Sequence, residues 1–158
     1  MEFTGALNFS SEPDGSQTGV PTLIHDARHV FGKYPLNNAQ DTLLNGRGFL
    51  LADSPSCVLD WSDPKEVADK HYDEARLLAQ RLLPDFEIWP ISTHTFRNES
   101  ITEHHWIDGI QYGPCVEFVH NDYADTLSPD NKRIEKTFAE IMGMPTDKRV
   151  IGINIWRS

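Results

Sequence analysis

Residues 116–125 constrain the possible folds of this chain more than any other stretch. An apolar run rich in β-branched and aromatic residues leads to His120 and Asp122 and then gives way to polar, turn-prone residues. Such a run predicts a strand, and residues i and i+2 of a strand project from the same face. We therefore expect His120 and Asp122 to be able to share one metal ion, with the remaining ligands coming from other residues and water.

Bulk properties restrict the class of protein. With 158 residues, the chain has the size of one domain, which we predict to cover residues 1–158. Its formal net charge of −10 argues against a nucleic-acid partner. No apolar run approaches the roughly 20 residues that span a bilayer, and no secretory signal is evident, so we predict a cytoplasmic protein with no membrane partner. Cys57 and Cys115 are expected to be buried thiols.

A helix after Asp63 is the clearest local prediction. Asp63 can cap the helix, Pro64 suits its first position, and Glu66 completes a capping-box pattern. Pro84 marks its end. The predicted apolar face has helical spacing and consists of Ala68, Tyr72, Ala75, Ala79 and Leu82.

This helix contains a second His-x-Asp pair, His71 and Asp73. Residues i and i+2 of a helix point in very different directions, so this pair cannot chelate one ion. Only the copy on the predicted strand has a usable geometry.

The remaining segments suggest a mixed α and β chain. Strands are predicted at 4–10, 48–51, 57–59, 87–97 and 150–157, with a polar linker at 11–22 and a loop or hairpin at 98–114. A second helix should begin after Ser128 and end at Gly143. His94 and Arg97 invite interpretation as an anion or substrate clamp, but the simpler interpretation, which we favour, is a polar pair hydrogen-bonded inside a sheet.

Several short motifs occur together in an order that resembles a known family. The chain is similar to a fungal and bacterial group of hydroxylase/desaturases related to the aspergillic-acid hydroxylase and to the cephamycin 7α-methoxylation subunit. The resemblance covers nearly the whole chain and rests on Leu7-Asn8-Phe9, Asp26-Ala27-Arg28, Arg47-Gly48-Phe49, Tyr72-Asp73-Glu74, His94-Thr95-Phe96-Arg97, Val119-His120-Asn121-Asp122-Tyr123 and Asn154-Ile155-Trp156-Arg157.

The resemblance implies an α+β fold with a partial jelly roll (a double-stranded β-helix) and two flanking helices. It also implies Fe(II) and 2-oxoglutarate as cofactors, with His120 and Asp122 as two ligands of a facial triad and Asn154 and Arg157 as cofactor-binding candidates. Family members continue beyond the Asn-x-Trp-Arg motif and carry the third ligand there. This sequence ends at Ser158, so we expect a domain that lacks the C-terminal part of the family.

Three functions are compatible with this pattern. The first is an oxygenase of secondary metabolism that hydroxylates or desaturates a hydrophobic natural-product intermediate. The second is a cofactor-independent dehydratase, isomerase or pericyclase, in which His120, Asp122, His94 and Arg97 supply acid–base and hydrogen-bonding groups. The third is a non-catalytic subunit that forms a homodimer or heteromer through exposed sheet edges.

Overall fold

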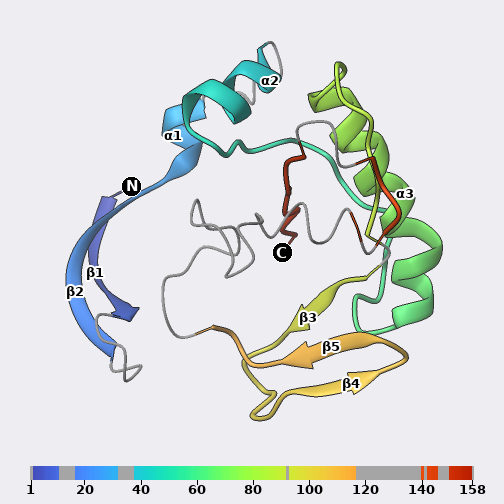
Figure 1. Cartoon of the computed structure of the whole chain (residues 1–158). Coiled ribbons are helices and arrows are strands. Elements are labelled where there is room, and N and C mark those ends of the chain that lie inside the picture. The colour runs from blue at the N-terminus through green and yellow to red at the C-terminus, as the bar shows by residue number, and fades with distance from the viewer. Residues whose placement is uncertain are drawn as a thin grey trace. The chain divides into compact units, whose positions relative to one another are not determined.

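The computed structural model describes residues 2–10, 17–31, 38–91, 93–116, 140, 142–145 and 150–157 (Figure 1). The chain divides into two compact units. One contains Met1–Leu7 and Gly19–Glu117, and the other contains Asn8–Thr18 and Phe118–Ser158. Helices and strands together confirm the predicted mixed α+β class, whereas the jelly-roll arrangement and the single domain remain predictions.

Strands β1 (Glu2–Ser10) and β2 (Gln17–His25) form a two-stranded sheet. The strand predicted at 4–10 is confirmed and begins two residues earlier. The linker prediction is wrong for residues 17–22, which belong to β2. Gly5 leaves room for a side chain of the second strand, because a Cβ atom at Gly5 would lie 3.1 Å from Cδ1 of Ile24.

Short helical turns follow β2. They are α1 (Ala27–Phe31), α2 (Ala39–Asp41) and the π-helical turn η1 (Thr42–Gly46). The predicted strand at 48–51 is wrong. The reason is local, because Gly48 adopts a positive φ of 75° and its N–H donates to the Thr42 carbonyl of the preceding turn.

The long helix α3 (Pro64–Leu82) begins as predicted. The Asp63 carboxylate accepts hydrogen bonds from the backbone N–H groups of Lys65 and Glu66, which satisfies two donors that a helix start leaves without partners. The predicted apolar face is confirmed at Ala79 and Leu82 and wrong in the first half of the helix, where Ala68 is exposed and Val67 is fully buried. The buried stripe consists of Val67, His71, Leu78, Ala79 and Leu82.

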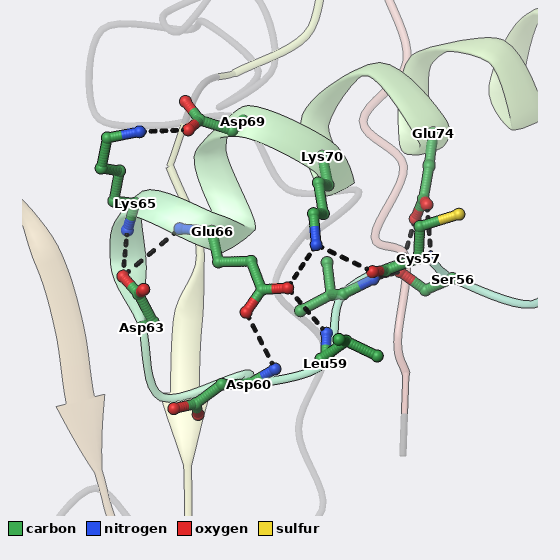
Figure 2. Close-up of polar contacts among 11 residues, drawn as sticks. Ser56, Cys57, Leu59, Asp60, Asp63, Lys65, Glu66, Asp69, Lys70 and Glu74 are labelled. Atoms are coloured by element: carbon green, nitrogen blue, oxygen red, sulfur yellow. Dashed lines mark hydrogen bonds and ion pairs between the residues drawn. The ribbon is translucent and has the colours of Figure 1, made fainter.

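An extended segment, residues 56–60, runs along the first half of α3, and we call it the strap (Figure 2). Glu66 accepts hydrogen bonds from the backbone N–H groups of Leu59 and Asp60 at 3.0 and 3.1 Å. Glu74 accepts one from Cys57 N–H at 2.7 Å. The strand predicted at 57–59 is therefore wrong. Carboxylates of the helix accept the hydrogen bonds from N–H groups that would otherwise go to a neighbouring strand.

The capping-box prediction for Glu66 is wrong. Its carboxylate binds the strap and the Lys70 ammonium, at 2.5 Å, whereas the Asp63 N–H donates to the Asp60 carbonyl. The Lys70 ammonium donates in addition to the Cys57 carbonyl at 3.1 Å. Cys57 and Cys115 are both exposed free thiols, so the prediction that they are buried is wrong.

A three-stranded sheet follows α3 in the order β3 (Thr95–Arg97), β5 (Ile110–Gly113), β4 (His105–Ile107) (Figure 1). β3 pairs with β5 in parallel and β4 pairs with β5 antiparallel. The hairpin predicted as one possibility for 98–114 is thus confirmed. Asp108 and Gly109, with φ of 50° and 81°, form its turn, as an Asp-Gly pair favours.

The central strand β5 anchors this sheet to the start of α3. Ile110 and Tyr112 are buried, and the Tyr112 hydroxyl donates to the Ser62 carbonyl at 3.3 Å, one residue before the helix cap. Tyr112 also stacks on His105, with ring centroids 5.3 Å apart. The sheet is short, and its position depends on contacts with the helix as well as on its own ladder.

Few residues of the second unit are described. Gly143, the predicted end of the second helix, has a φ of 68°, and its N–H donates to the Glu140 carbonyl, as expected for a glycine that ends a helix. The rest of that helix lies outside the described residues. The strand predicted at 150–157 is wrong, since residues 150–157 have no strand pairing; β-branched residues favour a strand only where a partner is available.

The capping role of Asp63 predicts a measurable loss of stability. Asp63→Ala should lower the free energy of unfolding by about 1 kcal/mol, because the first N–H groups of α3 lose their acceptor. Asp63→Asn keeps an acceptor oxygen and should remain close to the wild type. Urea denaturation at neutral pH measures both variants, and equal stability of Asp63→Ala and the wild type would contradict the assignment.

The role of Glu66 predicts a specific acid sensitivity. The hydrogen bond from Lys70, followed by the N–H of Leu59, lowers the pKa of Glu66 from 4.5 to about 2. A carboxylate with a lowered pKa stabilises the fold above its unfolded value, and this contribution is lost as the pH falls from 4.5 towards 2. Glu66→Gln should therefore unfold more easily than the wild type at neutral pH and lose less stability between these two pH values. Glu99→Gln, in the exposed turn after β3, is the control, and thermal melts across this range provide the measurement.

Candidate functional site

His94 and Tyr72 form the most distinctive polar pair in the described part of the chain. Tyr72 lies on α3, and His94 immediately precedes β3. The Tyr72 hydroxyl lies 2.9 Å from Nδ1 of His94, and the two rings meet edge to face with centroids 5.8 Å apart. Both side chains are half-buried, so the helix holds the imidazole in one orientation.

The second ring nitrogen of His94, Nε2, is buried. Among the described residues, no hydrogen-bond partner lies at Nε2. Buried polar atoms nearly always have a partner, so such an atom points to a role in binding or catalysis. In a neutral imidazole one nitrogen carries the proton and the other accepts one. If Nδ1–H donates to Tyr72, Nε2 is a base; if the phenol donates to Nδ1, Nε2–H is a donor.

Burial affects the protonation of both members of the pair. It lowers the pKa of His94, and the charge on His71 lowers it further. Burial also raises the pKa of the Tyr72 hydroxyl. Both shifts favour neutral groups, because a partly desolvated site disfavours charge. The pair is thus suited to passing a proton between neutral partners near pH 7.

His71 lies beside this pair on the buried stripe of α3. Its ring contacts Trp61 edge to face, with centroids 5.1 Å apart. Its Nδ1 atom is 3.9 Å from the Glu74 carboxylate, one helical turn further along. The second His-x-Asp pair behaves as predicted, because His71 is buried whereas the Asp73 side chain is 79% exposed.

The structure does not bring Arg97 together with His94 as a clamp. Arg97 ends β3, and its guanidinium donates through Nη1 to the Pro114 carbonyl at 2.9 Å. It therefore joins the end of β3 to the residue after β5. This contact corresponds to the simpler interpretation of Arg97, a polar group hydrogen-bonded within the sheet.

The other predicted site residues belong to the second unit. His120 and Asp122, the predicted metal ligands, lie outside the described residues. Asn154 is exposed and Arg157 is half-buried, and both lie in the segment 150–157. Their roles as cofactor-binding residues remain predictions.

A metal centre is not found among the described residues. In them, no three His, Cys, Asp or Glu side chains converge as a metal site requires. An open hollow does occur beside α3, lined by Ser54, Pro55, Glu74, Leu77, Leu78 and Arg81. Neither His94 nor Tyr72 lines it, so this hollow is distinct from the polar pair.

Two residues near His71 that were not predicted as site residues, Tyr72 and Glu74, could have been found from the sequence. Tyr72 and Glu74 belong to one of the ordered motifs, and a capped helix placed them one turn or less from His71. Trp61 gave no such signal, because its contact with His71 depends on how the chain turns before the helix.

Comparison with protein families gives a match that covers residues 8–158. It is the family described as an oxidoreductase/YMDC permease-like domain. The chain belongs to this family. Membership in the oxidoreductase/YMDC permease-like family agrees with the general prediction of an oxidoreductase-like protein. Comparisons with curated proteins and with solved structures gave no match.

The permease-like description of the family raises the question of membrane-spanning helices. Within the described ranges, no helix combines the length and the apolar character that crossing a bilayer requires. The longest, α3, has 19 residues and carries charged side chains along its exposed face.

Burial of His94 predicts how stability depends on pH. Because the folded pKa lies below 6.5, the unfolded chain binds a proton first as the pH falls. Stability should therefore decrease as the pH falls below 6.5, until the folded form also becomes protonated. His94→Asn should weaken this dependence, whereas His29→Asn on α1 should preserve it. Thermal melts between pH 5 and 8 are the measurement, and identical profiles for His94→Asn and the wild type would exclude this role.

Proposed function

We propose that this oxidoreductase-like family member is an enzyme that acts on a hydrophobic small molecule and uses His94, supported by Tyr72, to transfer a proton. The observation that carries the proposal is the His94 imidazole, bound through Nδ1 and buried at Nε2. An imidazole held in this way can accept a proton from a substrate or donate one to it at Nε2.

Exposed apolar residues that precede His94 in the chain are the support for a hydrophobic substrate. Trp89 and Ile91 are 40% and 46% exposed in the segment that leads to His94. Exposed large apolar side chains close to a polar group are common in sites for small apolar molecules. The acidic composition does not favour a polyanionic substrate.

The resemblance to hydroxylase/desaturases extends the proposal to a jelly-roll oxygenase with Fe(II) and 2-oxoglutarate. His120 and Asp122 would then hold the metal, which would supply the oxidant for hydroxylation or desaturation. His120 and Asp122 lie outside the described residues, and no three-ligand group occurs within them, so we derive no step through the metal.

A second candidate is acid–base catalysis without a redox cofactor, such as dehydration or isomerisation. It is favoured by the His94–Tyr72 pair, which contains both a proton donor and an acceptor at 2.9 Å. This chemistry moves protons only and needs no electron acceptor.

Product analysis distinguishes these reactions. The purified chain would be incubated with a panel of hydrophobic small molecules, with and without EDTA, Fe(II) and 2-oxoglutarate, and the products identified by mass spectrometry. Gain of one oxygen or loss of two hydrogens, abolished by EDTA, is expected of the oxygenase. Loss of water or isomerisation that survives EDTA supports the second candidate. Absence of turnover in every arm would favour a non-catalytic subunit.

The role of His94 makes a quantitative prediction for any turnover found. His94→Gln should reduce the rate about 10²- to 10⁴-fold, the usual contribution of a general acid or base. Tyr72→Phe removes one hydrogen bond and should cost up to about tenfold. His29→Gln, which changes an exposed histidine of α1, is the control. A fully active His94→Gln enzyme would refute the proposal.

A further inference from the structure

The strand β4 forms an edge of its sheet and exposes apolar side chains there. Within the ranges that the structure describes, β4 pairs with β5 alone (Figure 1). Trp106 and Ile107 of β4 are 66% and 46% exposed, whereas Ile110 and Tyr112 of β5 are buried. Edge strands attract other strands, and lysine, proline or a bulge usually protects them. His105–Ile107 contains neither lysine nor proline, and its register has no bulge.

The turn between β4 and β5 decides which backbone groups of β4 face the free edge. Asp108 and Gly109 have φ of 50° and 81°, and positive φ at both central residues is typical of a type I′ turn. The flanking residues, Ile107 and Ile110, pair across this turn. A two-residue turn makes its flanking residues a hydrogen-bonded pair. Such pairs then alternate with pairs that are not hydrogen-bonded along an antiparallel ladder.

This alternation leaves the backbone of Trp106 facing outwards. Trp106 pairs with Gln111 directly after the hydrogen-bonded pair, so its N–H and C=O point away from β5. His105 and Ile107, by contrast, direct their N–H and C=O groups towards β5. The exposed tryptophan is thus also the residue that offers a backbone donor and a backbone acceptor at the free edge.

A second copy of β4 has the groups that this edge can bind. In an antiparallel pair centred on Trp106, the N–H of each Trp106 donates to the C=O of the other. Both outward groups of the residue are then satisfied at once. The two indole rings lie opposite each other in this register, and cross-strand aromatic pairs stabilise a sheet.

The same register brings no like charges together. It places His105 opposite Ile107 of the other copy, and His104 opposite Asp108. The segment His105–Ile107 contains no lysine, arginine, aspartate or glutamate. Like charges directly opposite each other destabilise paired strands. The paired segment therefore adds no local repulsion to that between two chains with a formal net charge of −10 each.

We propose that the free edge of β4 is a self-association surface, at which two copies of this chain join through antiparallel β4 strands centred on Trp106. The two three-stranded sheets then form one continuous sheet of six strands. The paired segment is short, so we expect a weak, concentration-dependent dimer rather than an obligate one. The proposal concerns this sheet and does not depend on the activity of His94.

Exchange of backbone amides with solvent tests the pairing residue by residue in the unmodified full chain. NMR spectra of the ¹⁵N-labelled chain are compared from low micromolar to millimolar concentration. Salt at about 0.15 M screens repulsion between the chains beyond roughly 8 Å. The Trp106 amide should become protected at high concentration. The amides of His105 and Ile107, which donate to β5, should keep the same exchange rates throughout.

Replacement of the tryptophan tests the surface independently. Trp106→Lys places two like charges on the symmetry axis and removes a buried aromatic contact, so it should raise the dissociation constant of the dimer at least about tenfold. Trp106→Phe keeps an aromatic ring and the N–H and should dimerise nearly as the wild type does. Trp156→Lys, the control, changes another tryptophan that is 73% exposed and should leave the constant unchanged. Sedimentation equilibrium measures all four proteins.

Two results overturn the proposal. One is a chain that stays monomeric over the whole concentration range. The other is a dimer that persists unchanged in Trp106→Lys, because that dimer uses a different surface, such as the edge of β3. If the melting curve shows that Trp106→Lys does not fold, amide exchange in the wild type decides alone: dimerisation without protection at Trp106 then refutes the pairing.

Discussion

Two carboxylates of α3, Glu66 and Glu74, accept hydrogen bonds from the backbone of the strap, as a neighbouring strand would. Three backbone N–H groups of the strap, which pairs with no strand, donate hydrogen bonds to them. These contacts tie an irregular segment to the helix without a strand ladder. The strap then buries Val58 beside α3 and leads to Asp63, the residue that caps the helix.

The face of α3 that organises the fold also carries the candidate site. Val67, Leu78 and Leu82 provide an apolar stripe, and His71 interrupts it with a polar, ionisable group. Burying such a group is costly unless it has a compensating interaction. The Glu74 carboxylate lies 3.9 Å from Nδ1 of His71, Trp61 contacts its ring, and Tyr72 extends the polar cluster to His94. One helix thus joins the strap, the core and the imidazole before β3.

Local patterns predicted the parts of the fold in which neighbouring residues decide the structure. Asp63 and Pro64 specified the start of α3, and the residues of 4–10 specified a strand. Secondary-structure prediction was less successful where side chains of distant segments accept the hydrogen bonds of the backbone. Residues 57–59 have a strand-like composition, but the carboxylates of α3 take their N–H groups, and residues 150–157 have strand-like residues without a paired strand.

The candidate site also has one part that local patterns predict and another that depends on contacts between distant segments. The sequence by itself determined that His94 would be a candidate, that a capped helix would carry Tyr72 and Glu74, and that His71 and Asp73 could not share a ligand, because these conclusions depend only on residue type and helical or extended periodicity. Only the tertiary structure decided that His94 binds Tyr72, that Arg97 binds the carbonyl of Pro114, and that Glu74 binds the strap. These contacts join residues 17 to 22 positions apart or on different elements, and their formation depends on packing that no local pattern encodes.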